Sequence, residues 1–316
     1  MSETTEIDKA SLKSKVLLVD TNKDILPVTK LFLDEANLIG VRANKSDVME
    51  VLKSNVDLGA ILLAESYDDN PVGGIEMARQ IHAARPELPI FLRREKHDNL
   101  DNLDEDTRRM FCAAYTIGSL FRMRKVVDEY IFCLIYPNLL VRGIQEITER
   151  VLDSQNTNSN VVCDTPYVVR DRIIVGDTVS LIPLESSWCR GYMMLQVADP
   201  DDNASPLASK VSERLGEITN LVWGEFKNRY ISDEQASNPS RTQVPLLIKL
   251  NRKYISFGSD DPQLCFKYVL TDRDDPKISV VLSQRFIFNL SWSPEAFKEI
   301  HHSVESLVDS GELEFF

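Results

Sequence analysis

The chain has 316 residues, 27% of them charged, and a formal net charge of −13 with a pI near 4.9. Proteins that bind a nucleic-acid backbone present a basic surface to the phosphates, so this acidity argues against a nucleic-acid partner. The five cysteines are scattered without a C-x-x-C pair, and the histidines lack metal-ligand spacing, so we expect reduced thiols and no metal site. The length predicts two compact units.

Residues 1–14 are polar and charged, so we expect no signal peptide in them. The longest apolar run, residues 130–141, contains Pro137 and is too short to span a bilayer. We therefore expect residues 1–13 to form a mobile tail, and we expect a cytoplasmic protein without a membrane partner.

Short apolar strands alternate with helices between residues 14 and 135. The expected strands are residues 15–20, 38–43, 60–65, 88–93 and 113–117, and the expected helices are residues 24–36, 46–54, 74–85, 104–111 and 121–135. This alternation predicts an α/β domain with a doubly wound parallel sheet of the flavodoxin-like type. The order and lengths of the elements resemble those of a response-regulator receiver domain.

The chemistry of a receiver domain requires an acidic pair after the first strand for Mg²⁺, a phosphorylated aspartate after the third, a Ser or Thr after the fourth and a Lys after the fifth. Asp20 keeps one acidic position. Thr21 stands at the second acidic position, and Ala64, with Glu65 beside it, stands at the position of the phosphorylated aspartate. Arg93 stands at the Ser or Thr position, and Gly118 or Ser119 stands at the lysine position. We interpret residues 14–135 as a degenerate receiver-like domain that is not phosphorylated.

This domain is expected to serve docking or dimerisation. We expect the contact to use the helix–strand–helix face that includes Tyr115. A simple half-buried strand tyrosine is an equally good interpretation of Tyr115.

The second unit, residues 136–316, begins after a linker around residues 136–138. A helix is expected over residues 139–154 and another over residues 293–308, capped by Ser293. Strand-like stretches lie between them, at residues 172–184, 192–199, 244–250, 253–257, 264–271 and 277–285. This pattern predicts an α+β domain with a mostly antiparallel sheet and long helices.

Residues 209–230 have the pattern of one amphipathic helix. Its apolar stripe comprises Val211, Leu215, Ile218, Leu221, Val222 and Phe226, and its polar face comprises Glu213, Glu217, Asn220, Gly224 and Lys227. The i, i+3 spacing places Glu217 and Asn220 side by side. Solvated helix faces often carry Glu and Asn, so an ordinary surface is an alternative.

The string GEITNLVWGEFK, its helix and the strands around it resemble the signature helix of the CheC/CheX/FliY family of chemotaxis phosphatases, and CheX most closely. The resemblance covers about residues 137–316. It implies removal of phosphate from the aspartyl phosphate of a CheY-like response regulator. Asn220 would position the attacking water, and Glu217 would pair with a lysine of the partner. Mg²⁺ would be held by the receiver substrate, so no cofactor is expected in this chain.

The resemblance also makes Trp223, Gly224 and Lys227 candidate docking contacts, with packing on the sheet edge as an alternative for Trp223. An internal repeat, QEITERVLD, places Glu146 where Glu217 stands in the second copy, but Glu149 where Asn220 stands. One complete copy is consistent with CheX. The resemblance further implies a homodimer made by sheet pairing in the second unit.

Two functions follow from these observations. The first is a protein aspartyl-phosphate phosphatase, and the second is a non-catalytic adaptor that binds receiver domains or motility proteins. The presence of both Glu217 and Asn220 favours the phosphatase.

Overall fold

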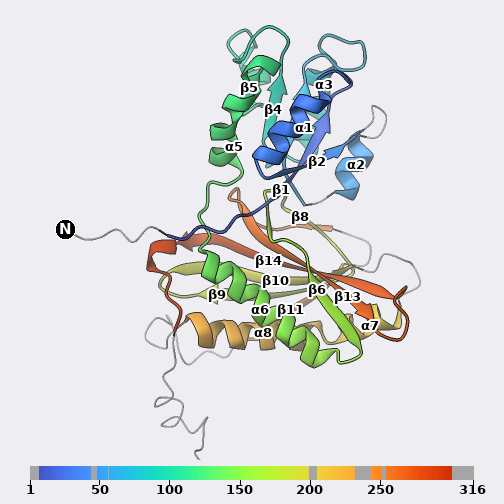
Figure 1. Cartoon of the computed structure of the whole chain (residues 1–316), viewed down its shortest axis with the longest axis vertical. Coiled ribbons are helices and arrows are strands. Elements are labelled where there is room, and N and C mark those ends of the chain that lie inside the picture. Colours follow the sequence, from blue (N-terminus) through green and yellow to red (C-terminus); the bar gives the residue numbers. More distant parts are fainter. Residues whose placement is uncertain are drawn as a thin grey trace, which may run out of the picture.

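A computed structural model describes residues 7–43, 48–55, 57–198, 205–231, 243–250 and 254–300 (Figure 1). The receiver-like unit and the second unit are stacked along the long axis of the molecule (Figure 1). Each unit is built on its own sheet.

The first unit contains a five-stranded, all-parallel sheet in the order β2-β1-β3-β4-β5. Its strands are β1 Ser14–Val19, β2 Leu38–Arg42, β3 Leu58–Ala64, β4 Ile90–Arg93 and β5 Ala113–Tyr115. Its helices are α1 Leu26–Glu35, α2 Val48–Ser54, α3 Gly73–Ala84, α4 Glu105–Arg108, the 3-10 helix η1 Ile117–Met123 and α5 Arg124–Tyr130. The expected parallel sheet is confirmed, and every residue of β3 is buried because helices cover both faces.

Two expected helices of this unit are shorter than the sequence indicated. The helix expected over residues 104–111 is a single turn, α4. The helix expected over residues 121–135 ends at Tyr130, whose carbonyl accepts a hydrogen bond from Arg170 of the second unit at 2.5 Å. The chain therefore leaves the first unit earlier than the apolar pattern predicted.

The second unit is built on an antiparallel sheet in the order β11-β9-β10-β14-β13-β6, with β7 also paired to β13. The strands are β6 Ser159–Cys163, β7 Tyr167–Val169, β8 Ile173–Val175, β9 Thr178–Glu185, β10 Cys189–Ala198, β11 Leu246–Lys249, β12 Tyr254–Ser256, β13 Gln263–Asp272 and β14 Ser279–Trp292. The helices are α6 Asn138–Gln155, α7 Pro206–Glu213, α8 Leu215–Tyr230 and the 3-10 helix η2 Pro294–Ala296. This confirms a mostly antiparallel sheet with helices.

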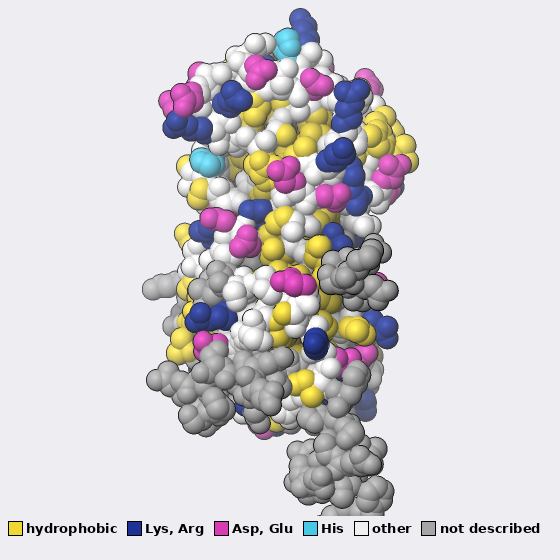
Figure 2. All heavy atoms as spheres, turned by 90° about the vertical axis from the view of Figure 1, so that its left-hand side faces the viewer, with side chains coloured by type: hydrophobic (Ala, Val, Ile, Leu, Met, Phe, Trp, Pro, Cys, Tyr) yellow, Lys and Arg dark blue, Asp and Glu magenta, His cyan; other side chains and the backbone are white. Residues whose placement is uncertain are grey.

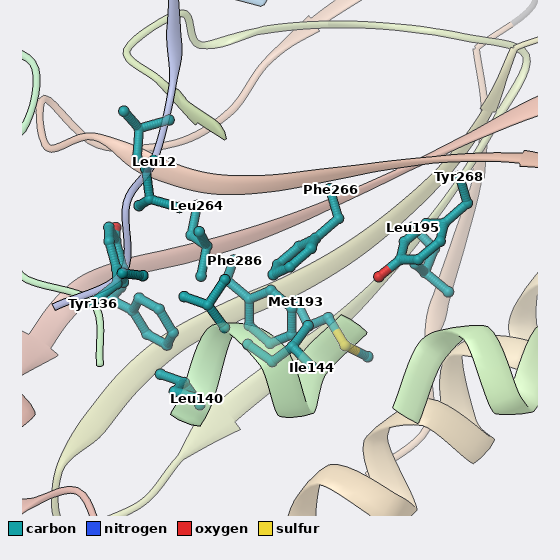
Figure 3. Packing of buried hydrophobic residues seen from close by; sticks show 14 of the residues in the cluster. Leu12, Tyr136, Leu140, Ile144, Met193, Leu195, Leu264, Phe266, Tyr268 and Phe286 are labelled. Atoms are coloured by element: carbon teal, nitrogen blue, oxygen red, sulfur yellow. The ribbon is translucent and has the colours of Figure 1, made fainter. Parts of the chain in front are cut away.

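Alternate residues of the central strand β10 face two different layers. Met193 and Leu195 pack with α6, as Figure 3 shows for Ile144, whereas Met194 belongs to a separate cluster on the opposite face. The small sheet formed by β8 and β12 supplies part of that opposite layer. Helices α6 and α8 thus lie on the side of the large sheet that is remote from the receiver-like unit (Figure 1).

The N-terminal segment is packed against the second unit. Lys9 and Lys13 form bridges with Pro137 and Tyr167, and Leu12 is buried close to Leu264 (Figure 3). The expectation of a mobile tail is therefore wrong for residues 7–13, because alternate apolar residues of this segment enter the shared core. Residues 1–6 lie outside the described residues.

The two units meet at the amino-terminal ends of the receiver-like strands. Ser14 donates its hydroxyl to the Val168 carbonyl at 2.8 Å, and the Arg170 amide donates to the Leu58 carbonyl at 3.1 Å. The carboxyl-terminal strand ends, which carry the degenerate receiver positions, consequently point away from the second unit.

The helix expected over residues 209–230 is interrupted at Arg214, which separates α7 from α8. The apolar pattern continues across the break because both helices pack on the same sheet. A second difference concerns Ser293, which makes no capping hydrogen bond; η2 ends at Ala296, and the Phe297 ring packs on Trp188 and Tyr230. The helix expected from residue 293 is therefore wrong up to residue 300, and residues 301–316 lie outside the described residues.

Candidate functional site

An exposed strip on α8 contains the main candidate residues. Glu217 is the third residue of the helix and Asn220 follows one turn later, and both are exposed. A Cβ atom placed on Gly224 would meet nothing within 4 Å. We call Glu217, Asn220 and Gly224 the α8 strip. No described residue covers the strip at Gly224.

The opposite side of α8 is buried against the sheet, as the amphipathic pattern predicted. The buried residues are Leu215, Ile218, Thr219, Val222, Trp223, Phe226 and Tyr230. The Thr219 hydroxyl donates to the Leu215 carbonyl at 2.7 Å, so its polar atom is satisfied within the helix. Leu221 differs from the prediction because its side chain is 38% exposed.

Arg214 holds the carboxylate of Glu217. Its Nε and Nη2 atoms donate to the two carboxylate oxygens at 3.2 and 3.3 Å, and its Nη1 donates to the Gln155 carbonyl at 2.8 Å. The first turn of a helix also favours an acidic side chain electrostatically. Because both side chains are partly exposed, this ion pair is worth at most about 1 kcal/mol.

Trp223 belongs to the core and not to the exposed strip. Its side chain is largely buried and its ring stacks on Phe226 with centroids 5.8 Å apart. The expectation of a docking contact is corrected in favour of packing, because the indole lies among the buried residues of α8. Lys227 is half-buried and already interacts with the rest of the chain.

In the first copy of the internal repeat, on α6, the residues that correspond to Glu217 and Asn220 make contacts within the chain. Glu146 pairs with Arg229 at 3.0 Å, and Glu149 accepts a hydrogen bond from Gln145 at 3.0 Å. Only the α8 copy therefore combines an exposed carboxamide with a neighbouring carboxylate.

The degenerate receiver positions form an internal ion-pair cluster. Arg93 Nε lies 2.5 Å from a carboxylate oxygen of Asp20, and Arg93 Nη1 lies 2.6 Å from Glu95. The next residue, Arg94, pairs with Glu65 at 2.9 Å. Burial alone lowers the pKa of Arg93, but the hydrogen bonds with Asp20 and Glu95 outweigh it and raise that pKa. Arg93 is charged at any physiological pH.

The remaining positions that were predicted from the receiver pattern carry no carboxylate side chain. Ala64 is buried and lies opposite Arg93 in the strand register. Thr21 is exposed, and Gly118 lies in η1. Tyr115 is buried, and burial raises the pKa of its hydroxyl, with a further contribution from Asp20. The burial of Tyr115 favours the alternative of a strand tyrosine that packs in the core, and the docking role of the helix–strand–helix face stays a prediction.

Two residues of these sites, Arg94 and Arg214, were not identified from the sequence. The signal for Arg94 is the Arg-Arg pair at the end of a buried strand, since acidic side chains also follow two other strands of the sheet. Arg214 could have been noticed at i, i+3 from Glu217. Its position at a helix break was hidden by the unbroken apolar stripe.

Within the described parts of the chain, no group of three or more His, Cys, Asp or Glu side chains is arranged to hold a metal ion. The helices of those parts are also too short or too polar to cross a lipid bilayer.

No family model and no curated protein matches the chain. Solved structures are similar to parts of it. A chemotaxis protein CheX from Desulfovibrio desulfuricans is 14% identical and covers 46% of this chain and 97% of its own, with a TM-score of 0.33. Chemotaxis protein CheX from Vibrio vulnificus is 16% identical over 46% of this chain and 97% of its own, with a TM-score of 0.31.

Response regulators are also among the similar solved structures. A response regulator from Thermotoga maritima is 13% identical and covers 38% of this chain and 99% of its own, with a TM-score of 0.33. Identities and scores of this size establish neither a shared activity nor family membership.

Proposed function

We propose that this protein is a phosphatase that acts on the aspartyl phosphate of a CheY-like response regulator in two-component or chemotaxis signalling. The observation that carries the proposal is the α8 strip, where Glu217 and Asn220 are exposed one turn apart next to the open position at Gly224. A receiver domain presented to this strip would meet a carboxylate and a carboxamide on one rigid helix.

The chemistry requires little from the phosphatase beyond positioning. Hydrolysis of an aspartyl phosphate adds water in line, breaks the P–O bond and releases inorganic phosphate and a free carboxylate. The Asn220 carboxamide can both donate and accept a hydrogen bond, so it can orient the attacking water. Glu217 would pair with a lysine of the partner and set the docking register. Mg²⁺ would arrive with the receiver substrate.

The arrangement of the two units agrees with action on a separate molecule. The helix α8 lies on the side of the large sheet remote from the receiver-like unit (Figure 1). That unit also has Ala64 at the acceptor position. Both observations support a substrate on another chain.

We propose a homodimer as well, made at the edge strand β11. This strand pairs only with β9 among the described residues, and Leu246 and Leu247 are 59% and 50% exposed. Exposed apolar edge strands readily pair with another strand. Leu247 also lies against Gly216, next to Glu217 in the chain. A second copy at this edge would border the α8 strip.

A non-catalytic adaptor is the second candidate. The Glu217 carboxylate is already paired within the chain. The receiver-like unit has a groove whose lining is both apolar and charged and includes Met123, Val126, Arg108, Arg122, Asp98 and Asp101. Figure 2 shows hydrophobic side chains gathered on one face of the receiver-like unit, with Lys and Arg as well as Asp and Glu side chains around them. These features suit binding without catalysis.

The experiment that tests the proposal follows phosphate loss from chemically phosphorylated CheY-like proteins of the same organism. Wild-type protein should accelerate the loss, and Glu217→Ala and Asn220→Ala should abolish the acceleration while the circular dichroism spectrum is retained. Arg150→Ala is the matched control. Arg150, on α6, pairs with Glu225 on α8, and neither residue belongs to the α8 strip. Binding without acceleration for every regulator would select the adaptor.

A further inference from the structure

Two consecutive arginines reach across the carboxyl-terminal edge of the parallel sheet. Arg93 is the last residue of β4 and Arg94 follows it, and their side chains are only 4% and 8% exposed. Arg93 reaches Asp20 after β1, and Arg94 reaches Glu65 after β3. Three adjacent strands are thus joined by two ion pairs at the edge where α/β sheets commonly hold ligands.

Arg93 must cross β3 to reach Asp20, because β3 lies between β4 and β1 in the sheet. The residue of β3 that lies opposite Arg93 is Ala64. Its methyl group is small enough to leave a path for the guanidinium. The small side chain at position 64 and the presence of Arg93 are therefore two parts of one arrangement.

The residues at this edge do not fit the divalent cation that a receiver domain would hold. Mg²⁺ requires oxygen ligands with free lone pairs in octahedral geometry. The carboxylates of Asp20 and Glu65 already accept hydrogen bonds from guanidinium groups, and no third carboxylate occupies position 64. Two guanidinium groups face the three carboxylates of Asp20, Glu65 and Glu95.

We propose that Arg93 and Arg94 replace a divalent cation with positive charges built into the chain, so that the receiver-like domain keeps one ion-paired state without metal. The two arginines perform this role permanently, whereas a bound ion can leave. The domain is then a fixed structural unit and not a switch.

Arg94 extends this arrangement to the neighbouring surface. Its Nη1 donates to the Asn99 carbonyl at 2.9 Å, and its backbone amide donates to the Tyr115 carbonyl at 2.7 Å. The loop after β4 and the edge strand β5 are consequently held by the same residue that neutralises Glu65. The shape of the surface formed by this loop and β5 therefore does not depend on a bound metal ion.

The test measures the thermal unfolding of the full chain in EDTA and in 10 mM MgCl₂ at matched ionic strength. The wild type should have the same Tm in both buffers. Arg93→Gln should lower the Tm by about 5–10 °C, because it leaves Asp20 without its buried counter-ion. The double substitution Arg93→Gln and Arg94→Gln should regain several degrees in MgCl₂, because the carboxylates are then free to bind the ion.

Arg109→Ala is the matched control, because it removes an exposed ion pair with Glu105 in the same domain and should leave the Tm nearly unchanged. Asp20→Asn provides a second variant if the double substitution does not fold, and it should lower the Tm without producing a response to Mg²⁺. A wild-type Tm that rises in MgCl₂ would overturn the proposal. So would an unchanged Tm in both Arg93→Gln and Asp20→Asn.

Discussion

The guanidinium of Arg214 donates to both carboxylate oxygens of Glu217, at 3.2 and 3.3 Å. This contact exists because the chain breaks between α7 and α8 at Arg214, which places the arginine at the start of the helix and within reach of the end of α6. The residue proposed to receive a lysine of the partner is thus already paired with a cation of its own chain.

Replacement of Arg214 by alanine should strengthen receiver binding. The exposed pair competes with the partner's lysine, and a contact of this kind is worth up to about 1 kcal/mol, so the gain should be at most about fivefold. Fluorescence anisotropy with a labelled, Mg²⁺-loaded CheY-like receiver at low and high salt would measure it. Arg150→Ala should leave the affinity unchanged. Weaker binding by Arg214→Ala would instead make Arg214 a positioning residue.

Two helix glycines should respond oppositely to substitution by alanine. Gly224→Ala should raise the free energy of unfolding by up to about 1 kcal/mol, because alanine favours the helix and its Cβ meets open space. Gly143→Ala should lower it, because its Cβ would lie 1.6 Å from the Tyr230 hydroxyl oxygen. Urea unfolding measures both.

Gly224→Leu extends this comparison to function. The larger side chain should leave the fold intact but reduce receiver binding, since it projects from the strip toward the partner. Undiminished binding by Gly224→Leu would place the docking surface elsewhere.

The buried pair of Arg85 and Asp171 joins the two units and should make stability depend on pH. Burial raises the pKa of Asp171 to about 6, and this effect exceeds the opposing attraction of Arg85. A raised pKa means that the folded protein binds the proton more tightly. The contribution to stability is therefore complete below the ordinary pKa near 3.8 and is lost as the pH rises through about 6.

Asp171→Asn removes this titration. The difference in unfolding free energy between wild type and Asp171→Asn should fall by up to about 3 kcal/mol as the pH rises from about 4 to 7. Urea unfolding at several pH values tests the sign. A difference that grows with pH would show that Arg85 lowers the pKa of Asp171.

The proposed dimer should depend on β11. Leu246→Lys places a charge on an exposed edge residue and should convert a dimer into a monomer, as measured by light scattering coupled to size-exclusion chromatography. Val162→Lys is the matched control, because Val162 is 60% exposed on the opposite edge strand, β6. A wild-type monomer would refute the dimer, and loss of the dimer with Val162→Lys alone would move the interface to β6.

Much of the fold was predictable because it depends on local patterns. The uninterrupted apolar run in β3 indicates a strand buried on both faces, and the periodicity around Ile218 and Phe226 indicates which side of α8 faces the sheet. The polar strip with Glu217 and Asn220 follows from the same periodicity.

The errors concern contacts between residues far apart in the sequence. Trp223 and Tyr115 are buried because other elements pack against them. The periodicity of a helix or a strand carries no information about that packing. The same holds for Leu12, which is ordered by the second unit. The ion pair of Arg93 with Asp20 spans 73 positions and could be inferred only with the strand order in hand.

The most direct test of the account compares the two residues of the strip under saturating and subsaturating concentrations of a phosphorylated CheY-like receiver. Asn220→Ala should lower kcat roughly 100-fold with little change in KM, because the water loses its orientation. Glu217→Ala should act mainly by raising KM, because docking is weakened. Equal kinetics for wild type and Asn220→Ala would contradict the claim that the α8 strip is a catalytic site.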